Sequence, residues 1–472
     1  MPYRRLRSLL ALLAVTGSGT AAAQPALPSV DPVGIDVTAD FTPQKRDYWV
    51  PAIEILGMNI ALNGAAQLYG SDWAPISPQT MKTNLTNPPV FDEDPYSINQ
   101  LGHPLGGAAL YSAARSTGHS FWISGLYAFG GSLVWETLLE NEPPSMNDQI
   151  TTPFGGMIIG EALHRFSRAL LYDGYGKPNL LRRGGAMLID PVGAANRAWW
   201  GDAWSKTVPP QMYAHFGVGA ARPSGYFGGE SGETQVHLQF VAEHGLTGDA
   251  AFMPRRALDH FEVRGALSAS SDDIDGNLYV RGLAIGSGYR TDSNRLRGLG
   301  GFFVAYDFSN EERTRHSQLG FGPGSTTELS FGTRGYLQAS VAGYLVPWGA
   351  AGGVSEGEKA MRDYHRGPGL AGLAELKLGR KGTGELRATS RLYRIQATLV
   401  DEPANETVSK TTIGGRLNLA KHHAIGVEGD FAYRRATFSE MDAAIGMDAT
   451  GRTTELRAYY AVNTDGMFDV FH

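Results

Sequence analysis

The sequence predicts a mostly β protein in which an antiparallel barrel of about ten to twelve strands follows an N-terminal α-helical segment. Three observations support this: an N-terminus patterned like an export signal, a glycine-rich chain without cysteine, and a change from helical to alternating hydrophobic periodicity near residue 211. Together they are typical of an outer-membrane β-barrel, with the helices plugging or capping it.

The first 23 residues form the predicted export signal. Arg4, Arg5 and Arg7 precede an apolar run at 9–15, and small residues at 21–23 suit signal-peptidase cleavage. So short an apolar run cannot cross about 30 Å of hydrocarbon, which favours a cleaved signal over a membrane anchor.

The composition excludes several classes of protein. The net charge of −6 becomes −9 without the signal, which holds three arginines and no acidic residue, so nucleic-acid binding is not expected. The absence of cysteine excludes disulfides and thiolate metal sites. Glycine, at 61 of 472 residues, exceeds the usual ~7%. The fold must therefore depend on packing or on closure of a sheet.

From residue 211 onward the hydrophobic pattern has a period of two. In Val236–Phe240 and Ile425–Tyr433, apolar residues take one face and polar residues, alanine or glycine the other. Similar runs recur to about residue 463, separated by turn-forming segments such as 272–277 and 379–382. Their lengths suit membrane-crossing strands of about 9–11 residues.

A soluble antiparallel sandwich remains the alternative fold, because its strands alternate in the same way. Trp348 is the only tryptophan after Trp204, so an aromatic girdle would consist of Tyr and Phe. The chain ends in Phe471-His472, near the terminal aromatic common in outer-membrane strands but not matching it.

Residues 48–173 show helical periodicity instead. Helices are expected at 51–68, 104–115, 120–140 and 154–172. Frequent glycine and alanine would let their backbones approach closely. The uncharged run 121–134 is shorter than the ~20 residues needed to cross a membrane, so these helices should pack on each other or inside a β enclosure.

The expected layout follows from these patterns. It comprises a signal peptide at 1–23, a disordered segment at 24–47, a helical domain at 48–173, a connector at 174–210 and the barrel at 211–472.

One ordered set of residues lies between about 90 and 175. It consists of His103-Pro104, Gly107, Tyr111, Ala114-Arg115, Trp135-Glu136, Glu140, Pro144-Ser145, Asn147-Asp148, Thr152, Gly155-Gly156, Gly160-Glu161 and Arg165. This set resembles an uncharacterised bacterial envelope family, the domain of unknown function 3943, over about a fifth of the chain. The resemblance implies a Gram-negative envelope protein with helices preceding or entering a β domain, and it implies no activity.

Glu136, Glu140 and Glu161 are expected in apolar helices, where a carboxylate needs a partner. Glu136 and Glu140 share a helical face, as do Glu161 and Arg165. The preferred interpretation is a buried structural network in which Arg115, Arg165 and Arg168 neutralise the glutamates. Trp135 and Asp148 would belong to the same network. Asp148 is also a capping type ahead of the helix expected at 154.

A metal site is a second interpretation. Glu161 and His164 have the i, i+3 spacing that can place a carboxylate and an imidazole on one ion, but a di-iron centre needs two such units. A mononuclear site could draw on His103, Glu136, Glu140, Asp148 and Glu161. No cofactor is predicted.

Hydrolytic chemistry on envelope lipid is a third interpretation. His103, Glu136, Glu140 and Glu161 are the catalytic candidates, and Ser145 could supply a nucleophile. Ser145 also suits a turn and does not stand in a Gly-x-Ser-x-Gly elbow, and no His-Glu-x-x-His string is present.

Three function classes follow. The preferred one is an outer-membrane barrel whose helices fill or gate the lumen, with outer-membrane lipid and the outer-membrane assembly machinery as partners. The others are an envelope lipid acyl hydrolase or transferase that uses the cluster of His103, Glu136 and Glu161, and a soluble periplasmic binding protein. A small molecule or a lipid could be the ligand.

Overall fold

The computed structural model describes residues 43–92, 94–172, 178–205, 209–225, 232–249, 252–271, 274–311, 314–352, 364–397, 404–438 and 449–463. The predicted signal peptide, most of the segment predicted to be disordered, and Phe471-His472 lie outside these ranges. Residues 43–47 are in contact with the helical domain, since the backbone N–H groups of Gln44 and Arg46 donate to Ala203 and Thr117 at 2.7 and 3.0 Å.

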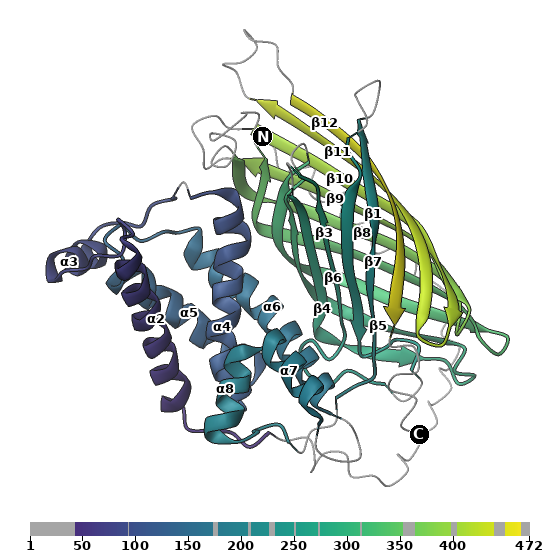
Figure 1. Ribbon diagram of the computed structural model, residues 1–472, viewed down its shortest axis with the longest axis horizontal. Helices are drawn as coiled ribbons and strands as arrows, with labels where there is room; N and C mark the ends of the chain where they lie inside the picture. The colour runs from purple at the N-terminus through teal and green to yellow at the C-terminus, as the bar shows by residue number, and fades with distance from the viewer. Residues whose placement is uncertain are drawn as a thin grey trace, which may run out of the picture. The chain divides into compact units, whose positions relative to one another are not determined.

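The N-terminal half of the described chain is helical (Figure 1). Its elements are α2 (Trp49–Tyr69), α3 (Pro78–Thr86), the π-helical turn η1 (Ile98–Gly102), α4 (His103–Ser116), α5 (Phe121–Leu138), α6 (Asp148–Leu171), α7 (Leu180–Ile189) and α8 (Pro191–Trp200). We call α2 to α8 with η1 the helical domain. The four predicted helices correspond to α2, α4, α5 and α6.

The predicted connector at 174–210 instead contains α7 and α8. Both begin at a capping side chain: Asn179 accepts from the N–H of Arg182, and Asp190 accepts from that of Gly193. Pro191 occupies the first turn of α8, where its missing N–H has no helical partner to lose. Each is only ten residues long, shorter than any of the four predicted helices, and its start is marked by a capping side chain.

The C-terminal half forms a closed antiparallel barrel of twelve strands, which confirms the predicted fold class (Figure 1). The strands are β1 (Met212–Gly225), β2 (Gln235–His244), β3 (Phe261–Ala269), β4 (Ile274–Arg290), β5 (Leu296–Ser309), β6 (His316–Phe331), β7 (Gly335–Gly352), β8 (Tyr364–Arg380), β9 (Gly384–Ala397), β10 (Ala404–Ala420), β11 (His423–Phe438) and β12 (Ala449–Asn463). Each pairs with its neighbour in sequence, and β1 pairs with β12.

The two ends of the barrel differ. Tight turns at 291–295, 332–334, 381–383 and 421–422 lie at the end where β1 begins, which we call the short-turn end. The 245–260 connection between β2 and β3 is at the same end. We call the opposite end the loop end.

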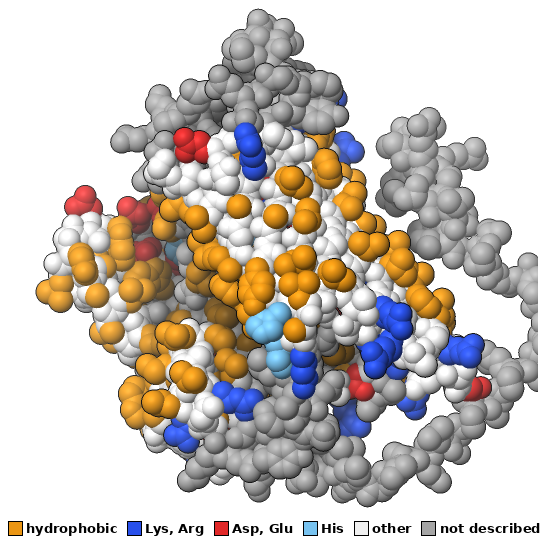
Figure 2. Space-filling view, turned by 45° about the vertical axis from the view of Figure 1, so that its right-hand side comes forward, with side chains coloured by type: hydrophobic (Ala, Val, Ile, Leu, Met, Phe, Trp, Pro, Cys, Tyr) orange, Lys and Arg blue, Asp and Glu red, His pale blue; other side chains and the backbone are white. Residues whose placement is uncertain are grey.

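Alternation gives the barrel an apolar outside and a charged inside. Exposed side chains such as Phe216, Phe302, Leu370 and Ile413 lie on the outward face, and apolar side chains cover the outside in Figure 2. Residues of the opposite parity carry the charges.

Side chains from distant strands meet across the lumen. Arg264 on β3 binds Glu375 on β8. Arg391 on β9 lies 2.6 Å from Asp307 on β5. The lumen is therefore filled, at these levels, by ion pairs of the barrel's own strands.

The outward face is not uniformly exposed, because one row of paired residues is buried across seven neighbouring strands. We call it the covered row. It consists of Ala214, Ala242, Val263, Val280, Tyr306, Leu319 and Trp348, each paired with the next. None is more than 6% exposed, although exposed Phe216 and Phe302 share this face.

The helical domain covers this row. The phenyl ring of Phe166 on α6 contacts those of Phe240 and Phe261 at centroid distances of 5.5 and 5.2 Å. Nearer the loop end, Phe91 stacks on Trp348 at 5.9 Å and Tyr96 on Phe308 at 5.6 Å. One apolar cluster thus joins helices and outer wall.

These contacts change the expectation that the helices plug or cap the barrel. The described contacts of the helical domain with strands are on their outward face, while side chains of the barrel itself occupy the lumen. The lumen-facing Arg264 and Arg434 bind Glu375 and Glu406 of the barrel itself. Sequence alternation defines two faces of a strand and does not say which one a helix will cover.

Helices α4 and α6 pack in backbone contact. A Cβ atom added to Gly107 would lie 1.8 Å from the carbonyl oxygen of Thr152, and one added to Gly156 would lie 2.3 Å from the carbonyl carbon of Gly107. Gly106, on the same helix, has open space around it.

We therefore expect Gly107→Ala to destabilise the helical domain by about 1–3 kcal/mol, because the added methyl group forces the two backbones apart. Gly106→Ala should be neutral or stabilising by up to about 1 kcal/mol, since only its helix propensity changes. Thermal unfolding followed by circular dichroism in detergent measures both variants. Equal effects of the two substitutions would contradict the close packing.

Candidate functional site

The candidate residues form two separate clusters, one at each end of the helical domain. Glu161, Arg115, Arg165 and His164 lie toward the short-turn end, and we call them, with their partners, the arginine cluster. Glu136, Glu140, Asp148 and His103 lie toward the loop end, in what we call the acid cluster.

Glu161 is the centre of the arginine cluster and is 0% exposed. Arg115 binds both its carboxylate oxygens, with Nε 2.5 Å from Oε2 and Nη2 2.9 Å from Oε1. Arg165, one helical turn after Glu161, donates from Nε to Oε1 at 2.7 Å. The hydroxyl of Tyr111 donates to Oε2 at 2.6 Å. The carboxylate is thus fully surrounded by donors.

The electrostatics of Glu161 follow from this geometry. Burial alone would raise the pKa of Glu161, but Arg115 and Arg165 hold that pKa well below its usual range. Glu161 is therefore a carboxylate in the folded protein.

Arg165 also ties the helical domain to the barrel. Its Nη1 lies 2.8 Å from Oδ1 of Asp259, and its Nη2 donates to the carbonyl of Ala257 at 2.9 Å. Asp259 belongs to the β2–β3 connection, and its Oδ2 accepts the backbone N–H groups of Arg255 and Arg256. One guanidinium group thus joins α6 to a loop 94 residues away in sequence.

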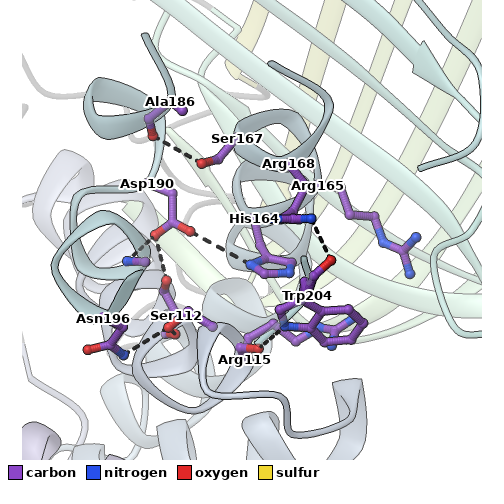
Figure 3. A network of polar contacts seen from close by, with 12 residues as sticks. Ser112, Arg115, His164, Arg165, Ser167, Arg168, Ala186, Asp190, Asn196 and Trp204 are labelled. Atoms are coloured by element: carbon purple, nitrogen blue, oxygen red, sulfur yellow. Dashed lines mark hydrogen bonds and ion pairs between the residues drawn. The ribbon is translucent and has the colours of Figure 1, made fainter. Parts of the chain in front are cut away.

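His164 and Asp190 form the next layer of the arginine cluster (Figure 3). Nδ1 of His164 lies 3.7 Å from Oδ2 of Asp190, whose Oδ1 accepts from Ser112 at 2.5 Å and from the N–H of Gly193. Burial lowers the pKa of His164 to about 4, so the imidazole is neutral at pH 7. Asp190 therefore holds α8 against α4.

Arg168 was expected to neutralise a glutamate and has other partners. It binds Asp202 and donates to the carbonyl of Trp204 at 2.6 Å. The indole of Trp204 lies over the guanidinium of Arg115 at 4.1 Å and donates to the carbonyl of Arg115 at 2.9 Å (Figure 3). These contacts fix the segment that follows α8.

The acid cluster is organised around two aspartates. Asp92 accepts at Oδ1 from the side-chain amides of Asn99 and Asn147 at 2.6 and 2.9 Å, and it is hydrogen-bonded to Asp148. Burial, together with the hydrogen bond to Asp92, raises the pKa of Asp148 well above its usual range. Burial would also raise the pKa of Asp92, but Asp148 and its other donors lower it. When the pair holds a single proton, Asp148 therefore carries it and donates to Asp92.

Asp148 does not cap a helix that starts at 154, as its residue type had indicated. Helix α6 begins at Asp148 itself, with Asn147 at the N-cap position, and the hydroxyl of Ser145 accepts the N–H of Asp148 at 3.2 Å. Pro153 lies inside α6, which therefore starts six residues before the predicted helix at 154–172.

Glu136 and Glu140 have no arginine or lysine within ion-pair distance among the residues that the structure places. Oε2 of Glu136 accepts the N–H of Ser145 at 2.8 Å, and Glu140 accepts the indole N–H of Trp135. Burial and the neighbouring Glu140 raise the pKa of Glu136 to about 9. Burial raises the pKa of Glu140 to about 7. Protonation therefore takes the place of the predicted arginine partners.

The described contacts do not form a nucleophile–base pair. His103 Nε2 lies 3.4 Å from Asp148 Oδ2, but the Ser145 hydroxyl is bonded to the N–H of Asp148 and not to His103. Within the described ranges, no group of three or more His, Cys, Asp or Glu side chains is arranged to hold a metal ion. Glu161 and His164 have the separate partners given above.

Asp92 and Asp259 were not singled out in the sequence. Asp92 belongs to the polar loop "FDEDPYSIN". This loop lies within the stretch that resembles the family, and that was the available signal. Asp259 carries no local signal, because its partner is on a distant helix.

We expect Glu161→Gln to destabilise the protein by about 3–5 kcal/mol, because it removes the carboxylate that neutralises two buried guanidinium groups. Glu136→Gln is the matched control: Gln resembles the protonated carboxyl of Glu136 and can still accept from Ser145, so the loss should stay below about 1 kcal/mol. Thermal unfolding in detergent measures both. A larger loss for Glu136→Gln would overturn the assignment of charges.

The acid cluster also predicts a pH dependence. The pKa of Glu136 rises from 4.5 to about 9 on folding, so the unfolded chain binds fewer protons between these values. The contribution of Glu136 to stability is therefore full below pH 4.5 and is lost as the pH rises toward 9. Glu136→Gln should remove this loss in unfolding scans from pH 5 to 9. An unchanged dependence of stability on pH would be the contrary result.

Residues 88–192 match the family model described as "Domain of unknown function (DUF3943)", which confirms the resemblance seen in the sequence. This range contains both clusters and most of the helical contacts with the covered row. No curated protein matches the chain.

Several solved structures are similar in part. The NanC porin is 8% identical, with 52% of this chain and 98% of that chain covered and a TM-score of 0.27. The TodX monoaromatic hydrocarbon channel (deltaS2 mutant) is 8% identical, with 55% and 91% covered and a TM-score of 0.26. The outer membrane channel DcaP of Acinetobacter baumannii is 10% identical, with 53% and 96% covered and a TM-score of 0.24.

Proposed function

We propose that this protein is an outer-membrane β-barrel whose helical domain binds the outside of the barrel and faces membrane lipid. In this proposal the protein acts through its lipid-facing helical domain and not through a pore. The observation that carries the proposal is the surface of α2, α4, α5 and α6.

The exposed residues on these four helices are uncharged and almost all apolar. The large ones are Trp49, Ile53, Leu56, Ile60, Leu62, Leu68, Tyr69, Leu105, Trp122, Leu126, Phe129, Leu133 and Phe154. Gln67 is the single polar residue among the exposed ones, and every charged residue on these helices is buried or half-buried. A monomer in water rarely presents so extended an apolar face, whereas lipid requires one.

The apolar residues form stripes along the helices. Trp122, Leu126, Phe129 and Leu133 recur at the spacing of one helical face on α5, and α2 has the same spacing from Trp49 to Ile60. The arginine and acid clusters lie at the two ends of the domain, so each apolar stripe runs between two groups of ionisable side chains. Among the described helices, none has the length and hydropathy of a membrane-crossing segment.

The barrel supports the same environment. Its outward face is apolar and its charged residues point inward, as in a barrel that crosses a membrane. Apart from the 245–260 connection, the turns at the short-turn end span two to five residues, whereas connections at the loop end reach eleven. Short periplasmic turns and longer outer loops are typical of outer-membrane barrels. A soluble periplasmic protein would leave this outer wall in water.

The pore and enzyme alternatives have less support. The lumen has a vestibule of about 220 Å³ at the short-turn end, lined by charged residues that include Glu243, Lys377 and Arg416. Deeper in the lumen, Lys377 binds Glu375, and Arg264 binds the same carboxylate. For an acyl hydrolase, Ser145 lacks the hydrogen bond to His103 that would activate it.

Spin labelling tests the proposal directly, because the chain has no cysteine of its own. Single cysteines would replace Leu126 on α5 and Leu56 on α2, with Ile413 on the outer barrel wall as the lipid reference and Asp292 in a turn as the water reference. In bilayers, we expect labels on α5 and α2 to match the Ile413 label in high accessibility to oxygen and low accessibility to a polar nickel chelate. Accessibility like that at Asp292, or burial from both reagents by a protein partner, would overturn the lipid-facing assignment.

A further inference from the structure

A small cavity lies at the short-turn end, between the helical domain and the barrel wall. Its accessible space is about 30 Å³. The lining comprises four arginines (Arg115, Arg165, Arg168 and Arg256), two histidines (His164 and His244), Trp204 and Pro209-Pro210. The ion pairs of the arginine cluster explain how Glu161 can be buried, but they do not explain why a cavity remains beside the arginines.

The charge around the cavity is unbalanced. The four guanidinium groups are partnered by three carboxylates, Glu161, Asp202 and Asp259. Burial and the neighbouring Arg165 lower the pKa of Arg256, as expected where positive charge accumulates. Arg197, which donates to Ser167 at 3.2 Å, lies outside the cavity lining and has Asp190 and Asp202 near it, so it does not change this excess of one positive charge.

Two buried ring nitrogens on the wall make no hydrogen bond within the described residues: Nδ1 of His164, which lies 3.7 Å from Asp190, and Nε2 of His244. His244 is 0% exposed. Its other nitrogen, Nδ1, donates to the carbonyl of Asp259 at 3.0 Å, and the ring stacks on Phe261. Because Nδ1 carries the proton, Nε2 is a free hydrogen-bond acceptor in a cavity rich in arginine, where it can accept from the O–H of a singly protonated phosphate monoester.

We propose that this cavity binds the terminal oxygens of a phosphate group, supplied by the headgroup of a membrane lipid. Arginine suits such oxygens because its planar donors pair with them two at a time. About 30 Å³ holds roughly two water-sized atoms. The space therefore admits phosphate oxygens and leaves the rest of the headgroup outside.

The surroundings favour lipid over free phosphate. Helix α7, whose Ala186 carbonyl accepts from Ser167 on α6, exposes Leu180, Leu181 and Leu188 at 84%, 86% and 86%. Trp199 and Trp200 are exposed at the end of α8, a few residues before Trp204 in the cavity wall. Exposed leucines and tryptophans beside a cationic site are typical of a membrane interface. This step rests on the proposed membrane location.

The test measures binding to the full chain in an uncharged detergent. Isothermal titration would compare dioctanoyl phosphatidic acid, dioctanoylglycerol, which lacks the phosphate, and inorganic phosphate. The variants are Arg256→Gln, which leaves Arg165 on Asp259, and His244→Phe, which keeps the ring on Phe261. Arg183→Gln, an exposed arginine on α7 outside the cavity, is the matched control.

We expect the phosphatidic acid to bind, the diacylglycerol not to bind, and inorganic phosphate to bind at least tenfold more weakly than the lipid. Affinity should fall at least tenfold in Arg256→Gln and in His244→Phe, and remain unchanged in Arg183→Gln. Equal binding of the diacylglycerol, equal affinity for inorganic phosphate, or an equal loss in Arg183→Gln would each overturn the inference. Micelles make this result independent of the labelling in bilayers, so either proposal can fail alone.

Discussion

The outward face of this closed β-barrel presents apolar side chains, and the hydrophobic effect favours covering them with another apolar surface. Along β1 to β7 that surface is protein: the covered row from Ala214 to Trp348 lies beneath the helical domain. The rest of the wall is exposed. Much of the architecture follows from this division, because a helical domain that replaces lipid on one side of the barrel should itself resemble lipid-facing protein on its other side.

The two polar clusters solve the same physical problem in different ways. A buried carboxylate can be matched by cations or kept protonated. At the short-turn end, Arg115 and Arg165 neutralise Glu161, and Arg165 also joins the domain to Asp259 of the barrel. At the loop end, burial raises the pKa of Glu136 to about 9 and raises that of Asp148, which is hydrogen-bonded to Asp92. Both clusters lie where the helices meet other elements, so they fix the ends of the domain while glycine contacts fix its middle.

Part of this could be predicted from sequence. Period-two alternation predicted the barrel because it is a local property of each strand, and four helices were visible from their periodicity. The i, i+4 spacing of Glu161 and Arg165 corresponds to an ion pair in the structure. By contrast, Asp259 lies 94 residues from Arg165, and no local pattern joins them. Alternation also could not tell which face of the wall the helices cover, since Phe240 and Gln239 occupy equivalent places on opposite faces of β2.

That last pair of residues provides the most direct test. In the cysteine-free chain, Phe166→Cys on α6 would be combined with either Phe240→Cys, on the outward face, or Gln239→Cys, on the lumen face, and treated with a short bismaleimide in native membranes. A helical domain on the outer wall predicts efficient cross-linking of the 166–240 pair and little of the 166–239 pair. Preferential cross-linking of 166 to 239 would place the helix inside the barrel and contradict the account.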